Sequence, residues 1–357
     1  MKVYNYAAGP SMLAEEVKLE AQRDFLSYNN SGISVTEMSH RSKLYIEIHT
    51  EAEALLRELM DIGEDYYVLF LQGGASTQFE AVPLNLLSKG KADYVVTGNF
   101  ASKAYKEAQK YGDIALTASS KDKNHTYIPN VDDLNFREDI DYVHITSNNT
   151  IFGTRYTKWP TPNAPLVCDM SSMILSEVVD VNRFGIIYAG AQKNIAPAGL
   201  TIVIVKKSLI GNPLPICPTM LRYSTQAEKG SLYNTPPCFD IYMAMLTFRR
   251  LKKLGGIAAI QKVNEYKAGL LYDFIDNSNF YKNPVVPADR SLMNVPFTTP
   301  TTELDAQFVS EATKNGLVAL GGHRSVGGMR ASIYNAMPVE GVNALIDFMK
   351  TFAHNNK

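Results

Sequence analysis

Short apolar runs along the first two thirds of the chain alternate with amphipathic stretches. The runs rich in β-branched and aromatic residues predict buried strands at 67–71, 94–97, 142–146, 166–168, 186–189 and 201–205. Helical patterns follow several of them, for instance at 102–112. Apolar strands separated by helices are typical of a largely parallel sheet with helices on both faces. The sequence therefore predicts an α/β fold whose ligands bind at the carboxyl ends of the strands.

The last third of the chain has a different order of elements. Two long helical patterns follow Asp240, and beyond about Pro284 the pattern is strand, helix, strand, helix at 291–299, 303–316, 327–335 and 339–354. This order predicts a second, smaller α/β domain. We expect an N-terminal arm over 1–15, a large domain over 16–258 and a small domain over 259–357.

Two charged residues stand at the exits of predicted strands. Asp169 ends the run PLVCD, and Lys193 ends the segment FGIIYAGAQK, just after its apolar run. A lysine amine can form a Schiff base with the aldehyde of pyridoxal phosphate (PLP), and a carboxylate can keep the pyridine nitrogen protonated as an electron sink. Taken singly, such an Asp is more often a cap or turn residue and such a Lys a solvated charge. Together they indicate carbanion chemistry on amino acids.

A glycine-containing turn follows the strand at 67–71. Its sequence is QGGAST at 72–77, and adjacent glycines ahead of a helix N-terminus let backbone N–H groups hold a phosphate. A plain strand-to-helix turn explains the same residues equally well. The turn is neither a dinucleotide fingerprint nor a P-loop, because G-x-G-x-x-G and G-K-[ST] are missing. Pro83 is expected to bend the helix that follows.

Several other loop residues have side chains that suit a cofactor. Phe100 ends a strand and could stack on an aromatic ring, although phenylalanine is more often a core residue. Thr150 and the pair Asn234-Thr235 offer short hydrogen-bonding groups, which are at least as common in turns.

Two His-Arg pairs are the most unusual basic feature. They are His40-Arg41 and His323-Arg324, and Arg330 follows the second pair. The planar guanidinium suits carboxylate or phosphate, and paired basic groups suit a doubly charged anion. Alternatively, any of these residues could form a surface ion pair. Glycine pairs flank His323-Arg324, which favours a shaped loop over a helix face.

Composition narrows the function classes. The chain has 357 residues, 45% of them hydrophobic and 20% charged, with a formal net charge of −1. This balance gives no reason to expect nucleic acid or a membrane surface as partner. No apolar run reaches membrane-spanning length, and the N-terminal sequence lacks the apolar region of a signal peptide. We expect a cytoplasmic protein.

Cysteine and histidine usage argues against a disulfide framework and a metal site. The three cysteines, Cys168, Cys217 and Cys238, form no C-x-x-C pair, and the six histidines show no metal-ligand spacing. We expect no metal.

The segments NYAAGPSML, EMSHRS, FLQGGAST, CDMSS, AGAQKN, YNTPP and GGHRSVGGMRASIYNAM together resemble the class V, fold-type I PLP-dependent aminotransferases. The double His-Arg arrangement resembles the members that act on a phosphorylated substrate. The resemblance runs from about Tyr4 to the carboxyl end and implies a large PLP-binding domain, amino transfer from glutamate to a phosphorylated 2-oxo acid, and a homodimer with shared sites.

The resemblance also assigns roles to individual residues. Lys193 would carry the Schiff base, Asp169 would contact the pyridine nitrogen, and Thr150 would bond the cofactor 3-hydroxyl. The cofactor phosphate would be held by Ala75, Ser76 and Gln192, and by Asn234 and Thr235 of the other subunit. Arg330 would bind the substrate α-carboxylate, and the substrate phosphate would be bound by His323 and Arg324 with His40 and Arg41 of the other subunit.

One residue departs from the family pattern, and three competing functions remain. Many relatives carry tryptophan where this chain has Phe100, so the ring stack would bury less area. Another class V enzyme, such as a serine-glyoxylate aminotransferase, would share the cofactor and need no phosphate-binding arginines. A cysteine desulfurase would need a mobile reactive cysteine, whereas Cys168 lies in a predicted strand and neither Cys217 nor Cys238 lies in a glycine-rich loop. A PLP-binding regulator is the non-enzyme alternative, but no helix-turn-helix or basic face accompanies the domain.

Overall fold

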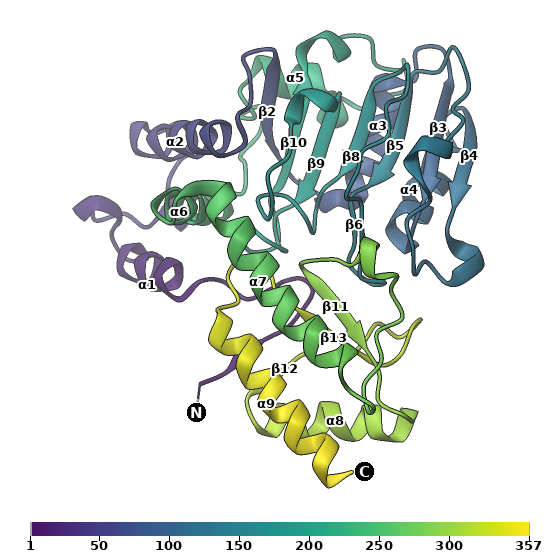
Figure 1. Ribbon diagram of the computed structural model, residues 1–357. Coiled ribbons are helices and arrows are strands. Elements are labelled where there is room, and N and C mark those ends of the chain that lie inside the picture. The colour runs from purple at the N-terminus through teal and green to yellow at the C-terminus, as the bar shows by residue number, and fades with distance from the viewer. Residues whose placement is uncertain (1, 357) are drawn as a thin grey trace.

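The computed structural model describes residues 2–356, and a seven-stranded sheet is its largest element (Figure 1). The strand order is β2-β10-β9-β8-β5-β3-β4. The bounds are β2 Tyr66–Leu71, β3 Lys91–Val96, β4 Asp113–Ser119, β5 Tyr142–Thr146, β8 Leu166–Asp169, β9 Ile186–Gly190 and β10 Thr201–Lys206. Neighbouring strands from β9 to β4 are parallel, whereas β10 is antiparallel to both β2 and β9. The predicted largely parallel sheet is confirmed.

Helices cover both faces of this sheet, as predicted. The helices of this part of the chain are α1 Glu15–Asp24, α2 Lys43–Met60, α3 Gly74–Leu86, α4 Asn99–Ala108, α5 Tyr223–Glu228 and α6 Cys238–Lys253. One apolar cluster joins the sheet to α2 and α6, with Ile48 and Leu246 fully buried. A second cluster on the opposite face joins it to α3, α4 and α5. The sheet is therefore closed to water on both sides, which explains its nearly continuous apolar strands.

All six predicted strands are present, but the bounds of one predicted helix need correction, and one strand was not predicted. The helix predicted at 102–112 is α4, Asn99–Ala108, and it ends early because the chain must enter the edge strand β4, whose Asp113 N–H donates to Gly90 O at 2.8 Å. Strand β4 itself has a half-exposed pattern without an apolar run, so the sequence did not predict it. Helix α3 continues through Pro83 to Leu86.

The last third of the chain forms the predicted alternation of strands and helices. Its main elements are α7 Gly256–Asp276, β11 Asn294–Phe297, α8 Thr302–Lys314, β12 Leu317–Val318, β13 Met329–Ser332 and α9 Val339–Asn355. Strands β11 and β13 pair antiparallel, and this pair carries Arg330. A separate hairpin in the large sheet region joins β6 Asn148–Asn149 to β7 Thr154–Arg155.

The N-terminal segment packs against this last third. Strand β1, Tyr4–Asn5, pairs in parallel with β12, and the Tyr6 hydroxyl donates to Gly341 O at 2.7 Å. Tyr4 and Tyr6 belong to the apolar cluster formed by α7, α8 and α9. The domain limits at 15/16 and 258/259 stay predictions.

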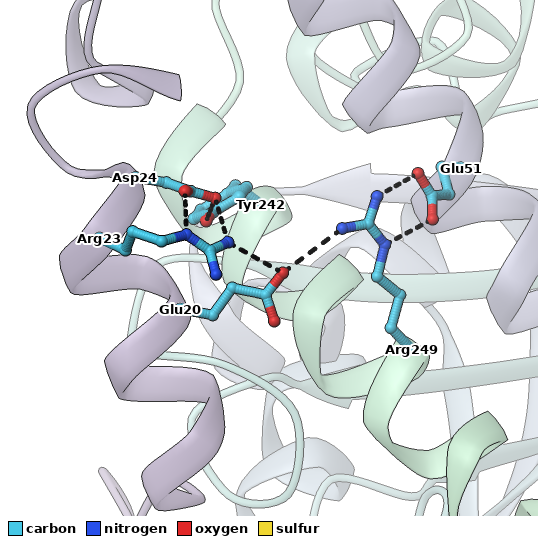
Figure 2. Close-up of polar contacts among 6 residues, drawn as sticks. All are labelled: Glu20, Arg23, Asp24, Glu51, Tyr242 and Arg249. Carbon is cyan, nitrogen blue, oxygen red and sulfur yellow. Dashed lines mark hydrogen bonds and ion pairs between the residues drawn. The ribbon is translucent and has the colours of Figure 1, made fainter. Parts of the chain in front are cut away.

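A network of ion pairs fixes α1 against α6 and α2 (Figure 2). Arg249 of α6 donates to both oxygens of Glu51, at 2.6 Å each, and lies 3.7 Å from Glu20. The Tyr242 hydroxyl donates to Asp24 at 2.8 Å. A single exposed ion pair contributes only about 0 to 1 kcal/mol to the free energy of unfolding. In a network, several pairs share the entropy cost of ordering the side chains. The network holds the two helices, α1 and α2, that flank the segment 25–42, and this segment carries the first His-Arg pair.

None of the helices within residues 2–356 combines the length and the apolar character needed to cross a membrane.

Candidate active site

A cavity of about 260 Å³ lies at the carboxyl ends of β5, β8 and β9. Nine of the predicted site residues line it: Ala75, Ser76, Phe100, Thr150, Asp169, Gln192, Lys193, His323 and Arg330. A larger cavity of about 640 Å³ lies between the end of α2 and the start of α7, and its lining includes none of the predicted site residues. We place the site in the smaller cavity, because its side chains, and not its volume, determine its chemistry.

Asp169 is the last residue of β8, and its carboxylate is oriented by one neighbouring serine. Asp169 Oδ1 accepts from the Ser171 N–H at 2.9 Å and from the Ser171 hydroxyl at 2.6 Å. Burial raises the pKa of Asp169, while the two bonds from Ser171 and the nearby Lys193 act in the opposite direction. Among residues 2–356 no group donates to Oδ2, so that oxygen remains available to a donor in the cavity.

Lys193 lies on the turn after β9, and its ammonium group points into the same cavity. Its Nζ donates to Thr150 Oγ1 at 2.7 Å and lies 5.4 Å from the centre of the Phe100 ring. Burial lowers the pKa of Lys193 to about 8, and the positive charge of Arg330 adds to that lowering, while Asp169 opposes it. A lysine with such a pKa has a substantial neutral fraction near pH 7 to 8, as a nucleophilic amine requires.

The N-terminus of α3 forms one wall of the cavity. Gly73 stands at its N-cap with φ of 93°, and a Cβ there would lie 2.1 Å from Thr77 Oγ1, so only glycine fits. Gly74, Ala75 and Ser76 follow at the first turn and line the cavity. The first N–H groups of a helix have no acceptor within the helix, so this wall can bind an anion.

Basic groups form the opposite wall. Arg330 donates to Thr150 O at 3.3 Å, and its buried Nε finds no partner among residues 2–356. His323 Nδ1 accepts from the Ser325 N–H at 3.2 Å, which leaves Nε2 as the protonated donor. Burial and the charges of Arg330, Arg324 and Lys103 lower the pKa of His323. Asp169 is the only carboxylate that the described residues contribute to the lining, so the wall favours an anionic ligand.

Five predicted site residues do not line the cavity of their own chain. His40 and Arg41 precede α2, and Arg41 is exposed, as is Arg324 on the loop before β13. Asn234 and Thr235 lie near the start of α6, where Gln72 Nε2 donates to Thr235 O at 3.0 Å. The single chain therefore brings together the residues predicted to bind the cofactor ring and the substrate carboxylate, but not the first His-Arg pair.

Sequence reasoning missed several lining residues. Ser171 and Ser172 follow Asp169 after Met170, and Asn148 lies two residues before Thr150, so all three are close in sequence to predicted site residues. The Thr150 hydroxyl donates to Ser172 Oγ at 2.9 Å, which in turn donates to Asn148 O at 3.0 Å. Gly9 lines the cavity too, and a Cβ there would lie 3.3 Å from Lys193 Cγ. No local pattern reports this approach, because the two residues are distant in sequence.

The chain matches the family described as Aminotransferase class-V over residues 3–345. It belongs to the class-V aminotransferase family. Within that family it is similar to a phosphoserine aminotransferase of Bacillus cereus, with 54% identity over 100% of this chain and 99% of the relative. A Listeria monocytogenes phosphoserine aminotransferase is also 54% identical, over 100% of this chain and 98% of the relative.

Solved structures agree with this relationship. The phosphoserine aminotransferase from Bacillus circulans subsp. alkalophilus superposes with a TM-score of 0.98 at 45% identity, covering 100% of this chain and 99% of that one. A PLP-bound phosphoserine aminotransferase from Trichomonas vaginalis gives 0.94 at 37% identity, covering 98% and 100%. The predicted family and fold class are confirmed.

The residues of the cavity fit pyridoxal phosphate, the cofactor of the family. Asp169 Oδ2 is available for a ring N–H, Lys193 is close to Thr150, and the α3 N-terminus is free to take an anion. These three features suit the ring nitrogen, the aldehyde and the phosphate of one ligand.

Proposed function

We propose that this chain transfers an amino group between glutamate and 3-phosphohydroxypyruvate, giving 2-oxoglutarate and 3-phosphoserine. The single observation that carries the proposal is the basic wall beside Lys193. There the buried Nε of Arg330 has no partner among residues 2–356, and His323 Nε2 is a donor. Each substrate carries two anionic groups, so it needs cations at two places. The curated relatives named phosphoserine aminotransferase support the same substrate pair.

PLP, when bound, supplies an aldehyde that takes up the amino group and a ring that withdraws electrons. Lys193 Nζ removes and returns the proton at the substrate α-carbon, since it is the buried amine with a pKa of about 8. Asp169 holds a proton at the ring nitrogen through Oδ2. A carboxylate about 4 Å from the ring cation would stabilise the protonated form of the ring by roughly 4 kcal/mol at an effective dielectric near 20.

Further residues bind and orient the ligands. Thr150 would bond the cofactor 3-hydroxyl, and Phe100 would stack on the ring. Ala75, Ser76 and Gln192 hold the cofactor phosphate. Arg330 binds the α-carboxylate of both substrates, whereas His323 and Arg324 bind the substrate phosphate or the distal carboxylate of glutamate.

Two copies of the chain complete each site in this proposal. His40, Arg41, Asn234 and Thr235 would enter the site of the partner subunit, because they lie outside the cavity of their own chain. Exposed apolar side chains accompany them: Leu26, Ile33 and Ile46 flank the first pair, and Met220 and Tyr233 lie near Asn234. Apolar patches of this kind mark interaction surfaces. We further propose that this homodimer works in the cytoplasm, in serine biosynthesis.

A direct comparison of two substrates tests the proposed function. With glutamate as amino donor, kcat/KM for 3-phosphohydroxypyruvate should exceed that for hydroxypyruvate by about 10² or more, since an unpaired desolvated cation costs about 2 to 5 kcal/mol. Equal values for the two ketoacids would favour a class V enzyme for unphosphorylated substrates. PLP binding without any transfer would favour the regulator.

A further inference from the structure

Ser171 links the two strands that carry the central pair of the site. Its hydroxyl donates to Asp169 Oδ1 at 2.6 Å and accepts from the Gly190 N–H at 3.1 Å. Asp169 ends β8, and Gly190 ends β9 just before the turn that carries Lys193. Ser171 is itself buried, with 6% of its surface exposed. One hydroxyl therefore connects the carboxylate to the strand that positions the lysine.

The two bonds from Ser171 fix which carboxylate oxygen faces the cavity. Both the N–H and the hydroxyl of Ser171 donate to Oδ1, so Oδ2 is the oxygen left for a ligand. We propose that Ser171 is a positioning residue for the cofactor, which orients Asp169 and keeps it ionised so that Oδ2 can hold the pyridine N–H. The proposal rests on the PLP site proposed above and assigns to Ser171 a role that the family resemblance did not give it.

The surroundings of Asp169 explain why a donor is needed there. Burial favours the protonated acid and raises the pKa of Asp169. Lys193 is the nearby cation, while the neighbouring Tyr188 of β9 and Cys168 of β8 both have pKa values raised by burial and stay neutral. A protonated Asp169 could not accept from a ring N–H with the same strength. Removing the Ser171 hydroxyl should favour the protonated acid and lower the acid dissociation constant of Asp169 by roughly 10- to 100-fold. This is the usual contribution of a hydrogen bond to a charged group.

Two ligands that differ only at the ring nitrogen separate this role from general structural damage. PLP has the nitrogen, whereas 1-deazapyridoxal phosphate carries a C–H in its place and cannot use Asp169. Equilibrium binding of each to the full-length chain gives two dissociation constants. Their ratio cancels the contributions of the phosphate, of Lys193 and of overall folding, and reports the contact between Asp169 and the ring nitrogen.

The wild-type ratio should favour PLP, and Ser171→Ala should reduce that preference about tenfold or more near neutral pH, with the affinity for the deaza analogue changed less than twofold. Ser172→Ala is the matched control: Ser172 lies next in sequence and in the same cavity, but contacts Thr150 and Asn148 rather than Asp169. Its ratio should stay within twofold of wild type. If Ser171→Ala does not fold, Ser171→Cys, a weaker donor of similar size, should reduce the preference in the same direction.

Two results would overturn the proposal. One is an unchanged ratio in the folded Ser171 variant, and the other is an equal loss of affinity for both ligands, as expected of a merely structural serine. Failure of the cofactor site itself has a different result, since wild-type protein would then bind neither ligand at its lysine.

Discussion

Replacing Arg330 with methionine should weaken substrate binding and at the same time stabilise the protein. The Arg330 guanidinium is desolvated, its pKa is lowered by burial, and it makes one bond at 3.3 Å to Thr150 O. Its buried Nε has no partner among residues 2–356. In the absence of substrate the protein therefore contains a costly unsatisfied group, which is typical of a site built for an anion.

The size of both effects follows from this geometry. Without Arg330 the substrate α-carboxylate loses a desolvated partner, which costs about 2 to 5 kcal/mol, so kcat/KM should fall by about 30-fold to several thousandfold for both substrates. Methionine keeps the length of the apolar stem and removes the unsatisfied donor, a gain of about 1 to 3 kcal/mol. At about 2.1 cal/mol/K per residue this raises Tm by roughly 1 to 4 °C for a chain of this length.

Steady-state kinetics and thermal unfolding of the substrate-free holoenzyme measure the two effects. Arg155→Met is the matched control, because Arg155 is a half-buried arginine whose charge is paired with Glu177. That variant leaves an unpaired carboxylate and should lower Tm. A Tm for Arg330→Met below that of wild type, or kinetics within fivefold of wild type, would refute the assignment of Arg330 as the carboxylate site.

Four further outcomes are expected. Lys193→Ala should leave a folded protein that binds PLP but turns over more than about 10⁴-fold more slowly, because nucleophile and proton carrier are lost together; rates within tenfold of wild type would exclude Lys193. In cofactor-free protein the pKa of Lys193 is about 8 when folded and near 10.5 when unfolded, so the free energy of unfolding should rise with pH across that interval, and Lys193→Met should lose this rise in denaturant titrations. Arg324→Ala should lower kcat/KM for the phosphorylated ketoacid by about 10² and for glutamate by less; a larger loss for glutamate would exchange the roles of Arg324 and Arg330. Inactive Lys193→Ala and Arg41→Ala chains, unfolded together and refolded, should regain about a quarter of wild-type activity in a two-fold dimer; no recovery despite confirmed heterodimers would place Arg41 outside the partner's site.

Burial patterns explain which parts of the fold could be predicted. The six predicted strands are largely buried on both faces, so their apolar runs are visible in the sequence alone. Strand β4 is an edge strand in which buried and exposed positions are mixed, so it has no apolar run. The antiparallel direction of β10 cannot be inferred from its composition. The pairing of β1 with β12 joins Tyr4 to Leu317 across most of the chain, and local patterns do not report such contacts.

The candidate site was predictable where chemistry is tied to strand ends. Asp169 and Lys193 stand at the ends of adjacent parallel strands, which places them at one edge of the sheet. Ser171 was overlooked because a serine after a strand is usually a turn residue. Arg41 and Asn234 lie outside the cavity of their own chain. In the proposed dimer they would serve the other subunit, and contacts within one chain cannot reveal such a role.

Reduction of the holoenzyme with borohydride, followed by peptide mass analysis, tests the central claim most directly. An absorbance band near the visible edge should disappear on reduction, and the cofactor should become fixed to the peptide that contains Lys193. A cofactor fixed to another lysine, or no band and no modified peptide in fully PLP-loaded protein, would contradict the proposed active site.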